Sequence, residues 1–344
     1  MHSVPSHSAS KPHDSDYSRN RARSIRFLVL LAAILALAFF LSLRAGSYNT
    51  PAAELIRGIF GRASDAKINL VIRNNRLPRI CTAMVAGAGL GLAGCILQAV
   101  LRNPLASAST LGVSQGATFG AAVAIIGSWA IPLCSFLGSL LVAAVILGLS
   151  QFKQISSEGI VLAGVAISSM LTGATTLLQY FADEVALSSL VFWTFGDLGS
   201  TDWQSLRGMA LAVLVLIGYC YLHRWDYNAL LSGEETALSL GIHVRRLTLT
   251  NVVLTCFVCS VIVSHVGLIN FIGLVAPHIV RMVVGNNYIY LIPGSVLAGA
   301  ALLLLSDLAA RVVIMPVILP IGALTAFLGG PLFLYLLFKG RGRT

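Results

Sequence analysis

The residues of this chain that could do chemistry are few, and most lie inside long apolar runs. The clearest are His265, His278, Arg281, Asp307 and Arg311. In such surroundings a histidine could contact a substrate or a haem, and a charged group could pair with another or lie on an ion pathway. Asp307 and Arg311 are four residues apart, so on a helix they would share a face and could form an ion pair.

Motifs for catalysis or nucleotide binding are absent from the printed sequence. No lysine follows a glycine, which rules out a G-x-x-x-x-G-K-[ST] phosphate loop, and no H-E-x-x-H motif occurs. Cys256 and Cys259 form one C-x-x-C without a second ligand pair, whereas a zinc site needs about four ligands. We therefore expect no enzyme activity, no metal site and no cofactor on this chain; ATP would have to bind another subunit.

The composition explains why so few polar groups are available. The chain has 344 residues, of which 57% are hydrophobic and 10% charged, and its mean hydropathy is +0.85. Soluble proteins carry about 25% charged residues, so a soluble enzyme is excluded. At roughly 20 residues per span, the length allows about ten transmembrane helices. The net charge of +10 then reflects membrane topology rather than nucleic-acid binding.

Apolar runs predict the positions of these helices. Residues 1–24 are polar and are expected to form a disordered tail, and Ile25 to Leu43 forms the first span. The other spans are expected at 80–101, 110–127, 130–150, 159–182, 206–224, 246–266, 270–284, 291–311 and 319–338. The runs at 110–127 and 270–284 are the weakest, because the first is rich in glycine and the second is short.

An even number of spans places both termini, including the tail 339–344, on one side. Most Lys and Arg residues then lie on that side, which we take to be the cytoplasm. The first outer loop breaks this trend, because it carries Arg44, Arg57, Arg62, Lys67, Arg73, Arg76 and Arg79. The basic residues of 44–73 have no assigned role.

A series of motifs, all in one order, resembles a known family. The motifs are Arg76-Leu-Pro-Arg79, Gly94, Gln98, Asn103-Pro104-Leu-Ala106, Gly233-Glu234-Glu235-Thr-Ala237, Leu240-Gly241, Phe271-Ile-Gly273-Leu-Val-Ala-Pro277-His278, Asp307-x-x-x-Arg311 and Leu319-Pro320-Ile-Gly322. From about residue 25 onwards the chain resembles the FecCD-type permeases, the membrane subunits of ABC importers for ferric siderophores, haem and vitamin B12. The resemblance implies an all-α, BtuC-like bundle of about ten helices over 25–338, in a bacterial or archaeal inner membrane.

The resemblance also implies partners. These are a second copy of the chain, two ATP-binding cassette subunits that hold ATP and Mg, and an external substrate-binding protein. The cytoplasmic segment 228–241 would be the contact with the ATPase, through Gly233, Glu234, Glu235, Ala237, Leu240 and Gly241. A short amphipathic helix from Asn228 to Leu240, ended by Gly241, would fit this role; an ordinary solvated loop helix is the alternative.

Two further sites are implied at the ends of the pathway. Arg76, Arg79 and Arg311 match outer arginines that dock carboxylates of the binding protein, and Arg forks suit that contact. Membrane anchoring of Arg76 and Arg79, or pairing of Arg311 with Asp307, are the alternatives. Ser156 and Ser157 match a cytoplasmic gate, although serine there could equally cap the following helix.

His265 and Asn270 replace the small or apolar residues that the family more often has. A hydrogen-bonded core histidine is the simpler interpretation of His265, and a substrate or haem contact is the alternative. His278 is expected to pack and to hydrogen bond at a helix break. An ion-coupled secondary carrier and a membrane haem or redox protein are the competing functions; few buried acids and few histidines weigh against them.

Overall fold

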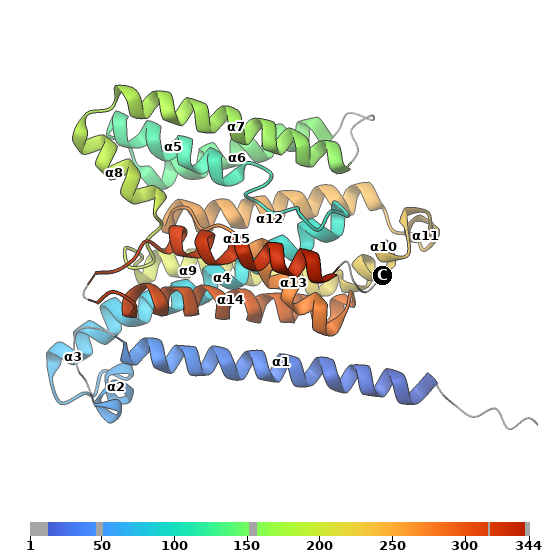
Figure 1. The fold of residues 1–344 in the computed structure, drawn as a ribbon, viewed down its shortest axis with the longest axis horizontal. Helices are drawn as coiled ribbons and strands as arrows, with labels where there is room; N and C mark the ends of the chain where they lie inside the picture. The colour runs from blue at the N-terminus through green and yellow to red at the C-terminus, as the bar shows by residue number, and fades with distance from the viewer. Residues whose placement is uncertain (1–12, 46–50, 151–156, 316, 341–344) are drawn as a thin grey trace, which may run out of the picture.

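The computed structural model describes residues 13–45, 51–150, 157–315 and 317–340, and all regular structure in these ranges is helical (Figure 1). The elements are α1 (His13–Arg44), α2 (Ala52–Ile59), α3 (Ala66–Val71), the π-helix η1 (Ile72–Arg76), α4 (Leu77–Val100), α5 (Val113–Gly127), α6 (Ile131–Ser150), α7 (Ser157–Phe181), α8 (Glu184–Thr194), α9 (Trp203–Leu222), α10 (Arg224–Leu231), α11 (Glu234–Ser239), α12 (Val244–Val266), α13 (Ile272–Val284), α14 (Tyr288–Val312) and α15 (Ile321–Gly340).

The ten predicted spans correspond to ten of these helices. Within the described ranges, seven helices are long and apolar enough to cross a membrane, namely α1, α4, α6, α7, α9, α12 and α14. Helices α5, α13 and α15 are shorter apolar helices that pack in the same bundle. The prediction of an all-α membrane fold with about ten spanning helices is confirmed.

Helix α4 is the central element of the bundle. Of its most apolar stretch 83% is buried, and it packs against α9, α12, α13 and α14. Its glycines make this possible, since a Cβ on Gly87 would overlap the backbone of Gly299 in α14. Small residues let helices approach closely where lipid supplies no hydrophobic drive. By contrast α1 and α7 are only 17% buried, so their apolar faces are left for lipid or another chain.

Helix α1 corrects the prediction for the N-terminal tail. The predicted disorder of residues 1–24 is wrong from His13 onwards, where α1 begins; residues 1–12 lie outside the described ranges. Once the apolar run has nucleated a helix, extending it through polar residues costs little. Ser24 Oγ also donates to the carbonyl of Asn20 at 3.0 Å, within the same helix. At the other terminus α15 extends to Gly340, two residues beyond the predicted end of the span.

Helix α13 has only 13 residues and starts inside the bundle. The preceding segment 267–271 is irregular, and Phe271 adopts a left-handed conformation with φ of 66°. A Cβ on Gly329 of α15 would lie 2.5 Å from the Phe271 Cβ, so this segment packs directly on α15. Irregular backbone at membrane depth requires such protein contacts.

The two ends of the bundle differ. The start of α1 and the end of α15 lie at the same end as α10 and α11, which we call the inner end (Figure 1). Helices α2 and α3 lie at the opposite, outer end. The first outer loop contains these two helices and is held by hydrogen bonds. Glu54 of α2 accepts them from the Ser64 backbone N–H at 2.7 Å and from Arg57 at 2.8 Å. The Ser64 hydrogen bond in particular holds the pKa of Glu54 below its usual range.

Candidate functional site: a buried ion cluster and an inner coupling segment

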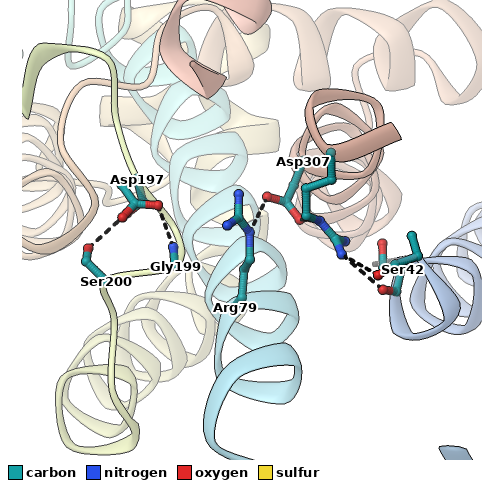
Figure 2. Close-up of polar contacts among 8 residues, drawn as sticks. Ser42, Arg79, Asp197, Gly199, Ser200 and Asp307 are labelled. Carbon is teal, nitrogen blue, oxygen red and sulfur yellow. Dashed lines mark hydrogen bonds and ion pairs between the residues drawn. The ribbon is translucent and has the colours of Figure 1, made fainter. Parts of the chain in front are cut away.

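Asp307 is the centre of a buried ion cluster at the outer end. Its Oδ1 lies 2.8 Å from Arg79 Nε and its Oδ2 lies 2.9 Å from Arg311 Nε. The Asp307 side chain is fully buried, and those of Arg79 and Arg311 are 13% and 10% exposed. Figure 2 shows Arg79 between the loop of Asp197 and Gly199 on one side and Asp307 on the other. The cluster thereby joins α4 to α14.

The outer arginines proposed for docking all have partners within the chain. Arg76 Nη1 donates to the Leu43 carbonyl at 2.8 Å, and Arg76 is 8% exposed. Arg311 Nη1 donates to the Ala45 carbonyl at 3.0 Å, which ties α14 to the end of α1. The pairing of Arg311 with Asp307 that the spacing allowed is confirmed. Docking of a binding protein by these arginines stays a prediction, and any such contact would have to be made alongside these internal bonds.

Four of the motif residues lie together where α4 crosses α13, namely Gly94, Gln98, Gly273 and Pro277. A Cβ on Gly94 would overlap the Gly273 backbone, so only glycine permits this crossing. Pro277 lacks an N–H and cannot bond the carbonyl four residues earlier, which belongs to Gly273. Gln98 Nε2 donates to that carbonyl, at 3.4 Å. Gln98 thus replaces the missing intrahelical hydrogen bond from a neighbouring helix.

The helix break predicted at His278 is wrong, because α13 continues through Pro277 to Val284. The missing hydrogen bond is compensated by Gln98, so the helix need not end. The His278 ring instead packs edge-on against Phe333 of α15, with ring centroids 6.1 Å apart. At the outer end of α15, Pro320 precedes the first turn and the Gly322 N–H donates to the Phe195 carbonyl at 2.8 Å.

The segment 228–241, predicted to contact the ATPase, lies in two short helices, α10 and α11, rather than in the single helix predicted over 228–240; we call this helix pair with its flanking glycines the coupling segment. Gly233 separates α10 from α11 and has φ of 110°, a backbone conformation that side chains disfavour. The prediction that Gly241 ends the segment is confirmed, since it follows the C-cap residue Leu240 and has φ of 82°. Ala237 is buried, whereas Glu235 and Leu240 are exposed. The segment therefore presents both charge and apolar surface at the inner end.

Three side-chain links tie the coupling segment to the bundle. The Tyr227 hydroxyl of α10 donates to Asn251 Oδ1 of α12 at 2.7 Å, and burial raises the pKa of Tyr227 so that it stays a donor. The Tyr288 N–H of α14 donates to Asn228 Oδ1 at 2.9 Å. Arg102, beyond the end of α4, forms an ion pair with Glu234 of α11. A displacement of the segment would therefore reach α4, α12 and α14 directly.

The Arg102 link depends on a turn that the motif Asn103-Pro104 provides. Arg102 has φ of 47°, and Asn103 Oδ1 accepts the Leu105 N–H at 2.9 Å. An asparagine side chain that bonds the backbone two residues on forms a turn by itself. The turn carries the chain out of α4 and leaves Arg102 beside the coupling segment.

The proposed gate and substrate contacts are placed as follows. Ser156 lies outside the described residues, and Ser157 is the first residue of α7. His265 Nδ1 lies 2.9 Å from the Val261 carbonyl of its own helix, consistent with the core interpretation. Asn270 is partly buried in the irregular segment before α13. The described residues contain no group of three or more His, Cys, Asp or Glu that could hold a metal.

A polar stripe on α7 was not recognised from the sequence. Ser169, Thr172, Gly173 and Thr176 are exposed and recur at the spacing of one helix face. The three hydroxyls donate to carbonyls one turn back, for example Thr172 Oγ1 to Ser168 O at 2.8 Å. The helical recurrence of small polar residues within the predicted span 159–182 was the available signal. Such a face can border a polar route through a membrane without charged groups.

Comparisons with known proteins agree on one family. The model of the FecCD transport family matches residues 34–339. An ABC transporter permease protein of Methanocaldococcus jannaschii is 43% identical, over 94% of this chain and 97% of its own length. The hemin transport permease HmuU of Yersinia pestis is 34% identical, over 93% and 96%. An inward-facing structure of a metal-chelate type ABC transporter is 32% identical, with a TM-score of 0.81 over 91% of this chain and 99% of that one.

Proposed function

The chain belongs to the FecCD transport family, and on that premise we propose that it is the membrane-spanning permease of a binding-protein-dependent ABC importer for a metal chelate. A ferric siderophore is the substrate class we favour, with haem and cobalamin as alternatives. The observation that carries the proposal is a coupling segment at the inner end, bonded to α12, to α14 and to the turn after α4 in a bundle that resembles a metal-chelate ABC transporter. The chain itself would carry no enzymatic step.

The coupling segment would transmit the movement of a partner ATPase. Two ATP-binding cassette subunits would hold ATP and Mg, because this chain has no phosphate loop. The exposed leucines Leu231, Leu238 and Leu240 offer an apolar contact for such a subunit. Since α10 and α11 are bonded to α12, to α14 and to the turn that follows α4, closure of the ATPases would shift these elements as a rigid group.

The translocation route would lie between two copies of the chain. The polar stripe on α7 supports this, because its residues are exposed on an apolar helix that is only 17% buried. Small hydroxyl and glycine positions would let a bulky chelate pass without strong binding. The gate proposed at Ser156 and Ser157 would close this route at the start of α7, on the cytoplasmic side.

The outer end would receive the substrate-binding protein. Helices α2 and α3 lie at this end (Figure 1), where the ion cluster joins the start of α4 to the end of α14. Arg76, Arg79 and Arg311 would contribute to docking by keeping this end positive while they hold α1, α4 and α14 together. The location would be an inner membrane with both termini in the cytoplasm.

Reconstitution tests the proposal against the secondary-carrier alternative. The chain, its ATPase and its binding protein would be placed in proteoliposomes, and uptake of radiolabelled ferric siderophore, haem or cobalamin measured. We expect uptake that requires ATP on the ATPase side and the loaded binding protein. Uptake by the chain alone, driven by a proton or sodium gradient, would refute the proposal. The environment of Asp307 weighs against ion-coupled uptake, because its two carboxylate oxygens are paired with Arg79 and Arg311 and are not available to bind a proton or a sodium ion.

A further inference from the structure

A cavity at the inner end lies behind the coupling segment and has no role in the function proposed above. Its volume is about 250 Å³, it is half open to the surroundings, and it is lined by the end of α4 and the turn after it, by α10, by α13 and by the segment between α13 and α14. Its polar lining consists of Gln98, Arg102, Tyr227, Arg281, Asn286 and Tyr288. The volume is large enough for a small polar molecule or several waters.

Two buried polar atoms of this lining have no hydrogen-bond partner among the described residues. One is the acceptor Gln98 Oε1, on a side chain that is 5% exposed, and the other is the donor Arg281 Nε. The orientation of the Gln98 amide is fixed, because its Nε2 donates to the Gly273 carbonyl that Pro277 leaves free. Both atoms are buried beneath the cavity surface, so a ligand would reach them only after a small shift of the lining side chains, and leaving each of them unsatisfied costs about 1–3 kcal/mol.

The cavity also has an excess of positive charge. Within the described part of the chain no carboxylate lies within ion-pair distance of Arg281, whose side chain contacts Tyr288. Arg102 at the mouth pairs with Glu234, and both side chains are about half exposed, at 46% and 50%. The C-terminal end of α13 compensates part of the Arg281 charge through the helix dipole, but only to about half a unit. Arg281 is half-buried, and a cation withdrawn from water in this way is normally paired.

We propose that this cavity is a binding site for a phosphate group that carries or adjoins a hydroxyl. Phosphate oxygens would accept hydrogen bonds from Arg281 and Arg102, and the hydroxyl would donate to Gln98 Oε1 once the lining side chains have shifted to uncover it. Both unsatisfied atoms and the unpaired charge are explained by this one ligand chemistry. Inorganic phosphate supplies it directly, and phosphatidylglycerol supplies it as a headgroup, since basic pockets at the cytoplasmic face of a helix bundle accept anionic lipid headgroups.

Occupancy of the site would act on the coupling segment. A phosphate at the mouth competes with Glu234 for Arg102, so binding and the Arg102–Glu234 ion pair oppose each other. This consequence rests on the proposed coupling role, whereas the binding site itself does not. Failure of transport in the reconstituted system would therefore leave the site standing, and failure of binding would leave the transport function standing.

The test uses the full chain in nanodiscs of phosphatidylcholine. Inorganic phosphate is titrated in one arm, and phosphatidylglycerol replaces part of the lipid in the other. Binding is read as a saturable rise in Tm and by native mass spectrometry. We expect at least one arm to show saturable binding, which also identifies the source of the phosphate group. Arg281→Gln should weaken this binding at least tenfold, whereas Arg246→Gln, the same charge change outside the cavity, should leave it within twofold.

Two exposed positions keep the test independent of misfolding. Asn286→Asp places a carboxylate at the cavity mouth and should weaken phosphate binding at least tenfold without affecting folding. Glu234→Gln frees Arg102 and should strengthen binding severalfold. No saturable response in either arm, or equal losses in Arg281→Gln and Arg246→Gln, would overturn the proposal and leave ordered water and the α13 dipole as the explanation.

Discussion

Arg79 Nε lies 2.8 Å from Asp307 Oδ1, and this contact joins residues 228 positions apart in the chain. We predict that Asp307→Asn destabilises the protein by about 3–5 kcal/mol, because it leaves Arg79 and Arg311 buried without a counter-charge. Thermal unfolding of the purified chain in detergent would measure the loss. Glu54→Gln also removes one carboxylate from an Arg contact, but its partner Arg57 is 61% exposed, so the loss of stability should be much smaller than for Asp307→Asn. Equal effects of the two substitutions would contradict the structural role of the cluster.

Gly94 gives a second prediction, because its neighbour is backbone rather than a movable side chain. Gly94→Ala should cost more than about 3 kcal/mol or abolish expression, since the methyl group overlaps Gly273 and α4 must separate from α13. Gly218 of α9 is the matched control, because a Cβ there meets nothing within 4 Å. Gly218→Ala should leave folding intact or improve it by up to about 1 kcal/mol. Size-exclusion profiles and unfolding temperatures of the two variants would decide between steric and general helix effects.

The third prediction concerns the ion pair between Arg102 and Glu234. Reversing the charge of Glu234 and Glu235 to lysine should leave the ATPase of the assembled importer active while uptake falls at least tenfold. The double exchange Arg102→Glu with Glu234→Arg should recover part of the uptake, since it restores the attraction in the opposite sense. Stability of the exchanged pair should change by less than about 1 kcal/mol, because both side chains are half exposed. Full transport by the Glu234 and Glu235 variant would refute the role of α11.

The polar stripe on α7 predicts a pattern of chemical access. Cysteine introduced at Ser169, Thr172 or Thr176 should react with a charged, membrane-impermeant thiol reagent in the assembled transporter, and the reaction should block uptake. Cysteine at Leu214, an exposed position of the apolar α9, should not react, because lipid would cover it. Protection of the α7 positions and reaction at Leu214 would place the route elsewhere. The unmodified chain, with its six native cysteines, gives the background reaction.

A pH dependence follows for the first outer loop. The folded-state pKa of Glu54 is lowered, chiefly by the Ser64 backbone hydrogen bond. The stabilisation is therefore present above the unfolded-state pKa of about 4.3 and is lost as the pH falls through the lower folded-state value. Hydrogen exchange across α2 and α3 should accelerate in acid relative to α4, after correction for the intrinsic rate. In Glu54→Gln this acid-dependent change should be absent.

The sequence predicts local features of this molecule well and long-range ones poorly. The spans follow from continuous apolar runs, and the Asp307–Arg311 pair follows from a four-residue spacing. Arg79 could not be placed in the same cluster, because its partner is on a helix far along the chain. The break at Gly233 and the continuity of α13 through Pro277 were both missed. Each depends on a contact or backbone angle that only the packed bundle determines, such as the Gln98 hydrogen bond to Gly273.

The burial of α4 has a consequence for how the protein is made. Helix α4 is the second span to leave the ribosome, yet the surfaces that fit Gly87 and Gly94 belong to α14 and α13, which are synthesised much later. Until then lipid would fill these grooves, and Arg79 would lack the Asp307 carboxylate that it pairs with in the complete bundle. We therefore expect the N-terminal half of the chain to stay only partly packed in the bilayer until α14 has been synthesised and inserted.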